Sequence, residues 1–193
     1  MHQGRTILTW KKQLPMWFTW SRMILCLPIM VVLLLMERPM AGYISAALFI
    51  VASITDWADG FFARRFNAQT TMGKFMDPIA DKILVSTILI LLIPLGVLGR
   101  DGPVLVILLL SRDIFIGGIR SIAAADRLII DAKATGKWKT AVQMTAIPCV
   151  LIGPLFGVPL TEIGRVALWA STILSLVSAW QYVKMYLDSR KGA

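Results

Sequence analysis

Histidine and cysteine are almost missing from this sequence of 193 residues, which contains one histidine and two cysteines. His2 lies in a basic N-terminal tail, so a catalytic triad built on histidine is not expected. Cys26 and Cys149 lie in apolar segments without CxxC spacing, which argues against a disulfide framework and against a zinc site. Any catalysis must therefore use carboxylates, lysines or arginines.

Charged residues are also scarce. They make up 16% of the chain, hydrophobic residues make up 57%, and the mean hydropathy is +0.72. A soluble domain of this length is not so apolar, so the composition predicts an all-α integral membrane protein. The first apolar stretch, residues 17–36, lacks a small-residue cleavage site and is interpreted as a retained spanning helix rather than a cleaved signal peptide.

Six apolar stretches are long enough to cross ~30 Å of hydrocarbon. The predicted transmembrane helices are residues 17–36, 42–63, 73–98, 104–125, 139–158 and 163–182. Turn residues, among them glycine and proline, separate helices 1 and 2, 3 and 4, and 5 and 6. Because no repeat, low-complexity tract or second domain is visible, a single membrane domain over residues 1–193 is predicted.

The 20 lysines and arginines are distributed unevenly between the two predicted sides of the membrane. Only Arg38, Arg100 and Arg165 lie at the three tight turns. By the positive-inside rule the opposite side is cytoplasmic, which predicts an inner-membrane protein with both termini in the cytoplasm. Topology and attraction to anionic lipid explain most of the +9 net charge, so no nucleic-acid partner is expected.

Some charges interrupt apolar helix instead of flanking it. With the predicted topology all of them fall in the cytoplasmic half, where they can share one polar cavity open to the cytosol. An ionisable residue at membrane depth costs ~2.5 to 3.5 kcal/mol on insertion scales, so such a group indicates a functional site. The residues are Asp56, Asp59, Asp77, Asp81, Arg112, Asp113 and Arg120.

Four of these aspartates lie at helical spacing from one another and from small residues. Asp56, Asp59, Gly60 and Ala63 share one face of the second predicted helix, and Gly73, Asp77 and Asp81 share one face of the third. Four converging carboxylates repel one another unless protons or cations neutralise them. Hard oxygen ligands select Mg²⁺, Mn²⁺ or Ca²⁺, and four of them can hold a pair of ions.

Structural salt bridges are the alternative explanation of these acids, with Arg64, Arg65, Lys74 and Lys82 as partners. This alternative leaves the glycines unexplained. Gly60 and Gly73 suit the close approach of a backbone to a large ligand, and the Arg64 guanidinium suits a phosphate. Acids, metal, glycines and arginine together indicate phosphoanhydride chemistry.

The complete pattern is Asp56-x-x-Asp59-Gly60-x-x-Ala63-Arg64, eight residues, then Gly73-x-x-x-Asp77-x-x-x-Asp81. It resembles in full the signature of the CDP-alcohol phosphatidyltransferases. This resemblance implies six transmembrane helices with a cytoplasm-facing cavity, a homodimer and two divalent metal ions, Mg²⁺ or Mn²⁺. It also implies transfer of a phosphatidyl group from CDP-diacylglycerol to an alcohol, with release of CMP.

Other stretches look like the branch of this family whose acceptor is glycerol 3-phosphate. They are SITDWADGFFARRFN, MGKFMDPIADKILV and GKWKTAVQM, and the likeness covers most of the chain from Thr19 onward. Thr19-x-x-Arg22 followed by Pro28 also fits the family. Met16 departs from the asparagine often found three residues before that threonine, so a nucleotide contact is not carried over to it.

The resemblance implies a role for each residue of the motif. Asp56, Asp59, Asp77 and Asp81 would form the metal site at the diphosphate of CDP-diacylglycerol, and Asp81 resembles the general base that takes the proton of the acceptor hydroxyl. Residues implied to line the nucleotide are Gly60, Ala63, Arg64 and Gly73.

The acceptor phosphate needs cations of its own. Arg112, Arg120, Lys137 and Lys139 lie on the same predicted side. Arg112 and Arg120 are about 80° apart in helical phase, so both can face one cavity. The alternative interpretation of Lys137 and Lys139 is that they only anchor the end of a helix at the cytoplasmic side of the membrane.

Two other functions stay open at this point. A member of the same family could accept inositol phosphate or serine, and only the basic acceptor site discriminates between these alcohols. A divalent-cation transporter would use the acids as its ion site. It would need polar residues on both sides of the midplane, whereas the predicted extracellular halves are nearly all apolar.

We predict that Asp81→Asn retains binding of CDP-diacylglycerol while turnover falls by ~10² or more, the usual effect of losing a positioned base. Substrate binding and CMP release are measured on the same purified variant. A parallel loss of binding and turnover would identify Asp81 mainly as a metal ligand.

Overall fold

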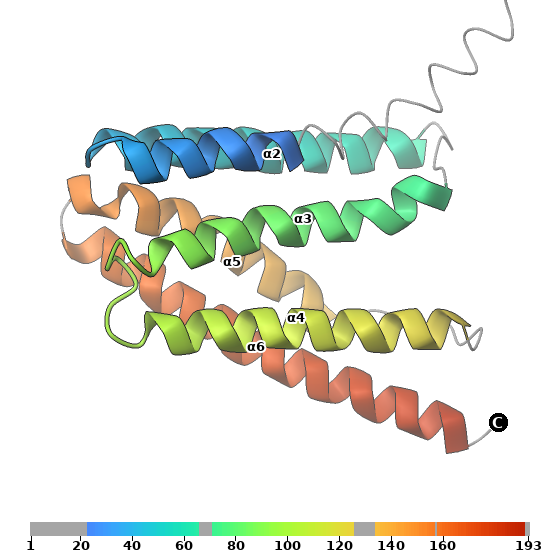
Figure 1. Cartoon of the computed structure of the whole chain (residues 1–193). Helices are drawn as coiled ribbons and strands as arrows, with labels where there is room; N and C mark the ends of the chain where they lie inside the picture. The colour runs from blue at the N-terminus through green and yellow to red at the C-terminus, as the bar shows by residue number, and fades with distance from the viewer. Residues whose placement is uncertain (1–22, 66–70, 126–133, 157, 192–193) are drawn as a thin grey trace, which may run out of the picture. The chain divides into compact units, whose positions relative to one another are not determined.

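The structure, a computed structural model, describes residues 23–65, 71–125, 134–156 and 158–191. Within these ranges it describes the side chains except those of residues 56–65, 71–78, 81, 124–125, 134–137, 155–156, 158 and 190–191. Every described element is a helix (Figure 1). A first helix, Met23–Leu35, precedes α2 (Met40–Arg65), α3 (Thr71–Leu92), α4 (Gly102–Ala125), α5 (Ala134–Phe156) and α6 (Val158–Lys191). The all-α prediction is confirmed for the described residues.

Two of the described helical segments, Gly102–Ala123 and Pro159–Ser189, are long and apolar enough to cross a membrane. Shorter apolar helices cover Met23–Leu35, Met40–Thr55 and Lys82–Leu92. Many large apolar side chains point outward, such as those of Leu35, 79% exposed, and Ile114, 75% exposed. Helices long and apolar enough to span, with large apolar side chains turned outward, identify a membrane protein.

The predicted third transmembrane helix, residues 73–98, is too long. The helix ends at Leu92, and hydrogen-bonded turns follow from residue 93. Pro94 lacks the backbone N–H that a continuing helix needs. Gly96 and Gly99 have φ angles of +70° and +75°, a left-handed conformation that glycine adopts without strain. The apolar character of residues 93–98 concealed this end.

The predicted last helix, residues 163–182, is too short at both ends. α6 begins at Val158 and continues to Lys191. Pro159 lies in the first turn, where a backbone N–H has no hydrogen-bond partner within the helix. The lack of an N–H in proline therefore costs nothing there, and the helix can start earlier than predicted. At the other end the helix continues through charged residues that the hydropathy pattern assigned to the tail.

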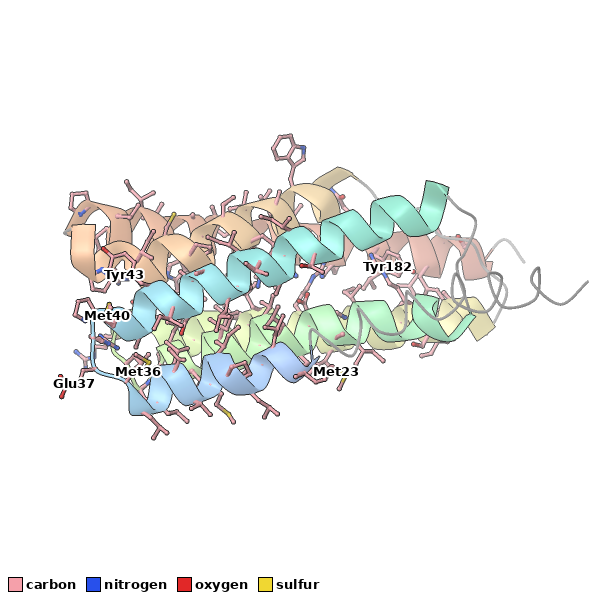
Figure 2. The ribbon with its side chains drawn as sticks, turned by 90° about the horizontal axis from the view of Figure 1, so that it is seen from above. Met23, Met36, Glu37, Met40, Tyr43 and Tyr182 are labelled. Atoms are coloured by element: carbon pink, nitrogen blue, oxygen red, sulfur yellow. The ribbon has the colours of Figure 1, made fainter. Side chains whose placement is uncertain are left out.

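Packing divides the chain into two compact units, Met1–Leu91 and Leu92–Ala193. In the first unit each helix buries one stripe at helical spacing, for example Ile29 with Leu33, and Leu84 with Ile88. Met36, Glu37 and Met40 lie together at the turn between the first helix and α2 (Figure 2).

In the second unit, α4 and α6 run parallel. The residues that contact one another follow the same chain order in both: Asp101 with Trp169, Arg112 with Ser175, and Arg120 with Tyr182. Figure 1 shows both helices starting at the same end of this unit. α5 joins α6 through residue 157 alone and packs against it, so it runs in the opposite direction. This is the order that three consecutive membrane crossings require.

Two glycines allow α5 and α6 to pack backbone against backbone. A Cβ atom added to Gly153 would lie 2.7 Å from the Cα of Thr161, and one added to Gly164 would lie 2.9 Å from the backbone N of Val150. Backbone atoms cannot rotate away as a side-chain end can. Small residues are the usual means of close helix packing in membranes.

We therefore predict that Gly153→Ala lowers the thermal unfolding midpoint of the detergent-purified protein, at a cost of about 1 to 3 kcal/mol for overpacking. Gly118→Ala on α4 is the matched control, because nothing lies within 4 Å of the added Cβ atom. Circular dichroism during heating measures both variants. Equal midpoints would contradict the packing interpretation.

Candidate active site

The aspartate motif is divided between two helices of the first unit. Asp56, Asp59 and Arg64 lie in the last turns of α2, while Asp77 and Asp81 lie in the first turns of α3. Because only residues 66–70 separate the helices, these turns lie at the same end of the unit (Figure 1). Both segments are continuous helix, so the spacing that places the acids on one face of each helix is present.

The side chains of the motif lie outside the described residues: Asp56, Asp59, Gly60, Ala63, Arg64, Gly73, Asp77 and Asp81. Thr19 and Arg22, and the side chain of Lys137, also lie outside them. The donor set of the motif consists only of carboxylate oxygens, which fits Mg²⁺ or Mn²⁺. Among the described side chains no group of three or more histidines, cysteines, aspartates and glutamates could hold a metal ion. The motif therefore stays the predicted metal site.

A second polar site lies in the other unit. Asp113 Oδ1 accepts hydrogen bonds from Arg112 Nη1, at 2.8 Å, and from Lys139 Nζ, at 2.5 Å. The side chains of Arg112, Asp113 and Lys139 are only 11%, 17% and 7% exposed. We call these three residues the buried charge cluster. It joins α4 to α5 by an ion pair inside the second unit.

Backbone groups fix the cluster to α6. Arg112 Nε donates to the carbonyl oxygen of Ser175 at 2.9 Å. Ser171 Oγ donates to the carbonyl oxygen of Lys139 at 3.1 Å. These contacts join α4, α5 and α6 at one level, so the positions of the two cationic groups follow from the packing of three helices.

The charges of the cluster do not cancel. Two cations share one carboxylate, which leaves a net charge of +1 among side chains that are mostly removed from solvent. The excess positive charge makes this site suitable for an anionic ligand, and a guanidinium suits phosphate oxygens in particular.

Arg120 lies farther along α4, with its guanidinium carbon 5.3 Å from the centroid of the Tyr182 ring. This distance is typical of a cation–π contact. Tyr182 is the labelled α6 residue in Figure 2. Since Arg112 and Arg120 both contact α6, they lie on one side of α4. The described hydrogen bonds place Lys139 at the same end of this side of α4 as Arg112.

The structure changes two interpretations of these residues. Lys139 is 6% exposed and ion-paired, so it is not a plain anchor at a helix end. Asp113 was recognised from the sequence only as a charge inside an apolar helix, and its role as the common partner of Arg112 and Lys139 was missed. A buried lysine needs an anion nearby. Asp113 and Lys139 are 26 residues apart in the sequence, however, so no local pattern shows that they pair.

Another polar group lies at the opposite end of α4. Asp101 accepts from Trp169 Nε1 at 2.7 Å and pairs with Arg165 Nη2 at 3.3 Å. Hydrogen bonding to its own backbone N–H and then to the Trp169 indole holds the pKa of Asp101 below its usual value. Arg165 also binds Glu162 at 2.7 Å. This group fixes the start of α4 against α6.

Both sites lie in the part of the chain that is similar to known proteins. The model of the CDP-alcohol phosphatidyltransferase family matches residues 12–177. The chain is 37% identical to a CDP-diacylglycerol–glycerol-3-phosphate 3-phosphatidyltransferase of Bacillus subtilis over 155 residues, which are 79% of this chain and 78% of the relative. A protein of the same name from Rickettsia typhi is 32% identical over 177 residues, 90% of this chain and 96% of the relative. A cardiolipin synthase (CMP-forming) of Oryza sativa subsp. japonica is 36% identical over 172 residues, 81% of this chain and 52% of the relative.

Proposed function

The chain belongs to the CDP-alcohol phosphatidyltransferase family, and we propose that it transfers the phosphatidyl group of CDP-diacylglycerol to sn-glycerol 3-phosphate. The products are phosphatidylglycerophosphate and CMP. The observation that carries the proposal is the likeness, over most of the chain, to relatives named for this reaction. The complete aspartate motif on α2 and α3 and the buried charge cluster agree with it.

The donor belongs to the motif of the first unit. Asp56, Asp59, Asp77 and Asp81 would hold two divalent metal ions, Mg²⁺ or Mn²⁺, while Gly60, Ala63, Arg64 and Gly73 would line the CDP group. When bound, the ions would neutralise the diphosphate and the charge that develops on the leaving CMP. The helical spacing of the acids and their all-oxygen donor set support this assignment.

In the transfer step, a hydroxyl oxygen of the acceptor attacks the phosphorus that carries the diacylglycerol. The bond from this phosphorus to the bridging oxygen breaks, and CMP leaves with the electron pair. Asp81 accepts the proton of the attacking hydroxyl, as a general base within hydrogen-bonding reach does. One phosphorus–oxygen bond forms and one breaks, so no oxidant or further co-substrate is needed.

The acceptor phosphate belongs to the cations of the second unit. Arg112 and Lys139 supply the buried positive charge, and Arg120 and Lys137 would supply more. An unphosphorylated alcohol would bring no anion to these cations. The cluster therefore favours glycerol 3-phosphate over serine as the acceptor.

The proposal extends to the arrangement in the membrane. It consists of one domain with six transmembrane helices, a cytoplasm-facing polar cavity, both termini in the cytoplasm, an inner-membrane location and a homodimer. The parallel course of α4 and α6 supports consecutive crossings. The arginines at the tight turns support the orientation, since few other basic residues lie on that side.

An acceptor panel tests the function. The purified protein receives CDP-diacylglycerol, Mg²⁺ or Mn²⁺, and one acceptor: glycerol 3-phosphate, inositol phosphate, serine or phosphatidylglycerol. The last is included because one relative is named a cardiolipin synthase (CMP-forming). We expect CMP release with glycerol 3-phosphate, its loss in excess EDTA, and its return with the metal. Turnover with another acceptor alone, or undiminished turnover in EDTA, would contradict the proposal.

We also predict that Arg120→Ala raises the KM for glycerol 3-phosphate by roughly one to two orders of magnitude. A hydrogen bond to a charged group contributes ~1.5 to 3 kcal/mol, and the exposed Arg120 can reach an anion while it rests on Tyr182. The KM for CDP-diacylglycerol should change little. Arg100→Ala, an exposed arginine at the other end of α4, is the control. A loss confined to CDP-diacylglycerol would reject Arg120 as an acceptor residue.

A further inference from the structure

Asp113 has a place in the second unit that neither its charge nor the family motif explains. Its Oδ1 atom is shared by a guanidinium on α4 and an ammonium on α5, at 2.8 and 2.5 Å. Sharing one oxygen brings two like charges closer than they would lie without it. The carboxylate therefore sets the distance between Arg112 and Lys139.

Each of the two cationic residues is also held from a second direction. Arg112 Nε binds the Ser175 carbonyl, which fixes the plane of the guanidinium. The backbone carbonyl of Lys139 accepts a hydrogen bond from the Ser171 hydroxyl, which anchors the backbone of Lys139 to α6. With the Asp113 contact, the Arg112 guanidinium is held at two nitrogens and Lys139 at its ammonium and its backbone, so neither cation can turn away without breaking a bond.

This geometry leaves capacity to bind an anion. An arginine side chain has five N–H donors, and the two described hydrogen bonds of Arg112 use two of them. The hydroxyl of Ser175, whose carbonyl binds Arg112, is buried and has no hydrogen-bond partner among the described residues. A buried hydroxyl without a partner is unfavourable, and a phosphate oxygen would satisfy it.

We propose that Asp113 is a positioning residue, which orients Arg112 and Lys139 as a pair to receive the phosphate of the acceptor. The inference rests on the proposed function, because it assigns that phosphate as the ligand. Asp113 does not touch the substrate. It acts by holding two cations at one place and by lowering their joint charge to +1, so that a dianion binds there and can still be released as part of the product.

A purely structural ion pair between α4 and α5 would have a different effect from a positioning residue. Loss of a structural pair lowers stability and affects both substrates alike. Loss of a positioning residue affects the acceptor selectively. The KM values for the two substrates separate these cases, since glycerol 3-phosphate and CDP-diacylglycerol are varied in turn on the same preparation.

The test compares Asp113→Asn, which keeps the shape and removes the charge, with Asp113→Glu, which restores the charge. We expect Asp113→Asn to raise the KM for glycerol 3-phosphate roughly 10- to 100-fold, on the scale of the loss when a partner that orients a metal ligand is removed. The KM for CDP-diacylglycerol should stay within about twofold, and Asp113→Glu should recover most of the loss. Asp101→Asn is the matched control, because Asp101 is also ion-paired beside α4 but at the other end.

An unchanged KM for glycerol 3-phosphate in Asp113→Asn, or an equal rise for both substrates, would overturn the inference. If the wild type itself releases no CMP with glycerol 3-phosphate, the proposed function fails instead, so the two failures are distinguishable. Should Asp113→Asn not fold, the double variant Asp113→Asn with Lys139→Met is compared with Lys139→Met. The double variant must show the higher KM for glycerol 3-phosphate, and equal values would reject the role of Asp113.

Discussion

The lack of water in the hydrocarbon layer is the constraint on which the described structure depends. Every backbone polar group in a membrane helix must find its partner within the protein, and an unpartnered polar side chain is unfavourable there. The hydroxyl groups of Ser53, Thr55 and Thr172 bind carbonyls one turn back in their own helices. The buried charge cluster is satisfied differently, by contacts between helices. The buried charge cluster therefore requires three helices, and these helices must keep one register for its bonds to form.

This requirement connects stability with function. In the second unit, close packing at Gly153 and Gly164 fixes α5 against α6, and the Asp101 group fixes the start of α4. The cluster depends on the packing of α5 against α6, because Lys139 comes from α5 and the groups that anchor the cluster come from α6. A substitution far from the cations can therefore alter their positions through helix packing alone.

Local patterns in the sequence predicted much of this arrangement. The start of α4 was predicted to within two residues, since Gly102 and Pro103 mark it. The aspartate motif was recognised because its spacing lies within single helices. The end of α3 was missed because residues 93–98 remain apolar after Pro94 and Gly96 have ended the helix. The pairing of Asp113 with Lys139 was missed because it connects different helices, and no periodicity within one helix reports it.

The position of each charged residue along α4 also gives its depth in the membrane. Counting from Asp101 at a rise of ~1.5 Å per residue, Asp113 lies ~18 Å along α4 and Arg120 ~28 Å along it. A hydrocarbon layer of ~30 Å that starts at Asp101 would place Arg120 at the far boundary and Asp113 ~12 Å beneath it. On the proposed function, the water-soluble acceptor would bind below the headgroup layer, with Arg120 nearer the surface and the Arg112–Lys139 pair deeper.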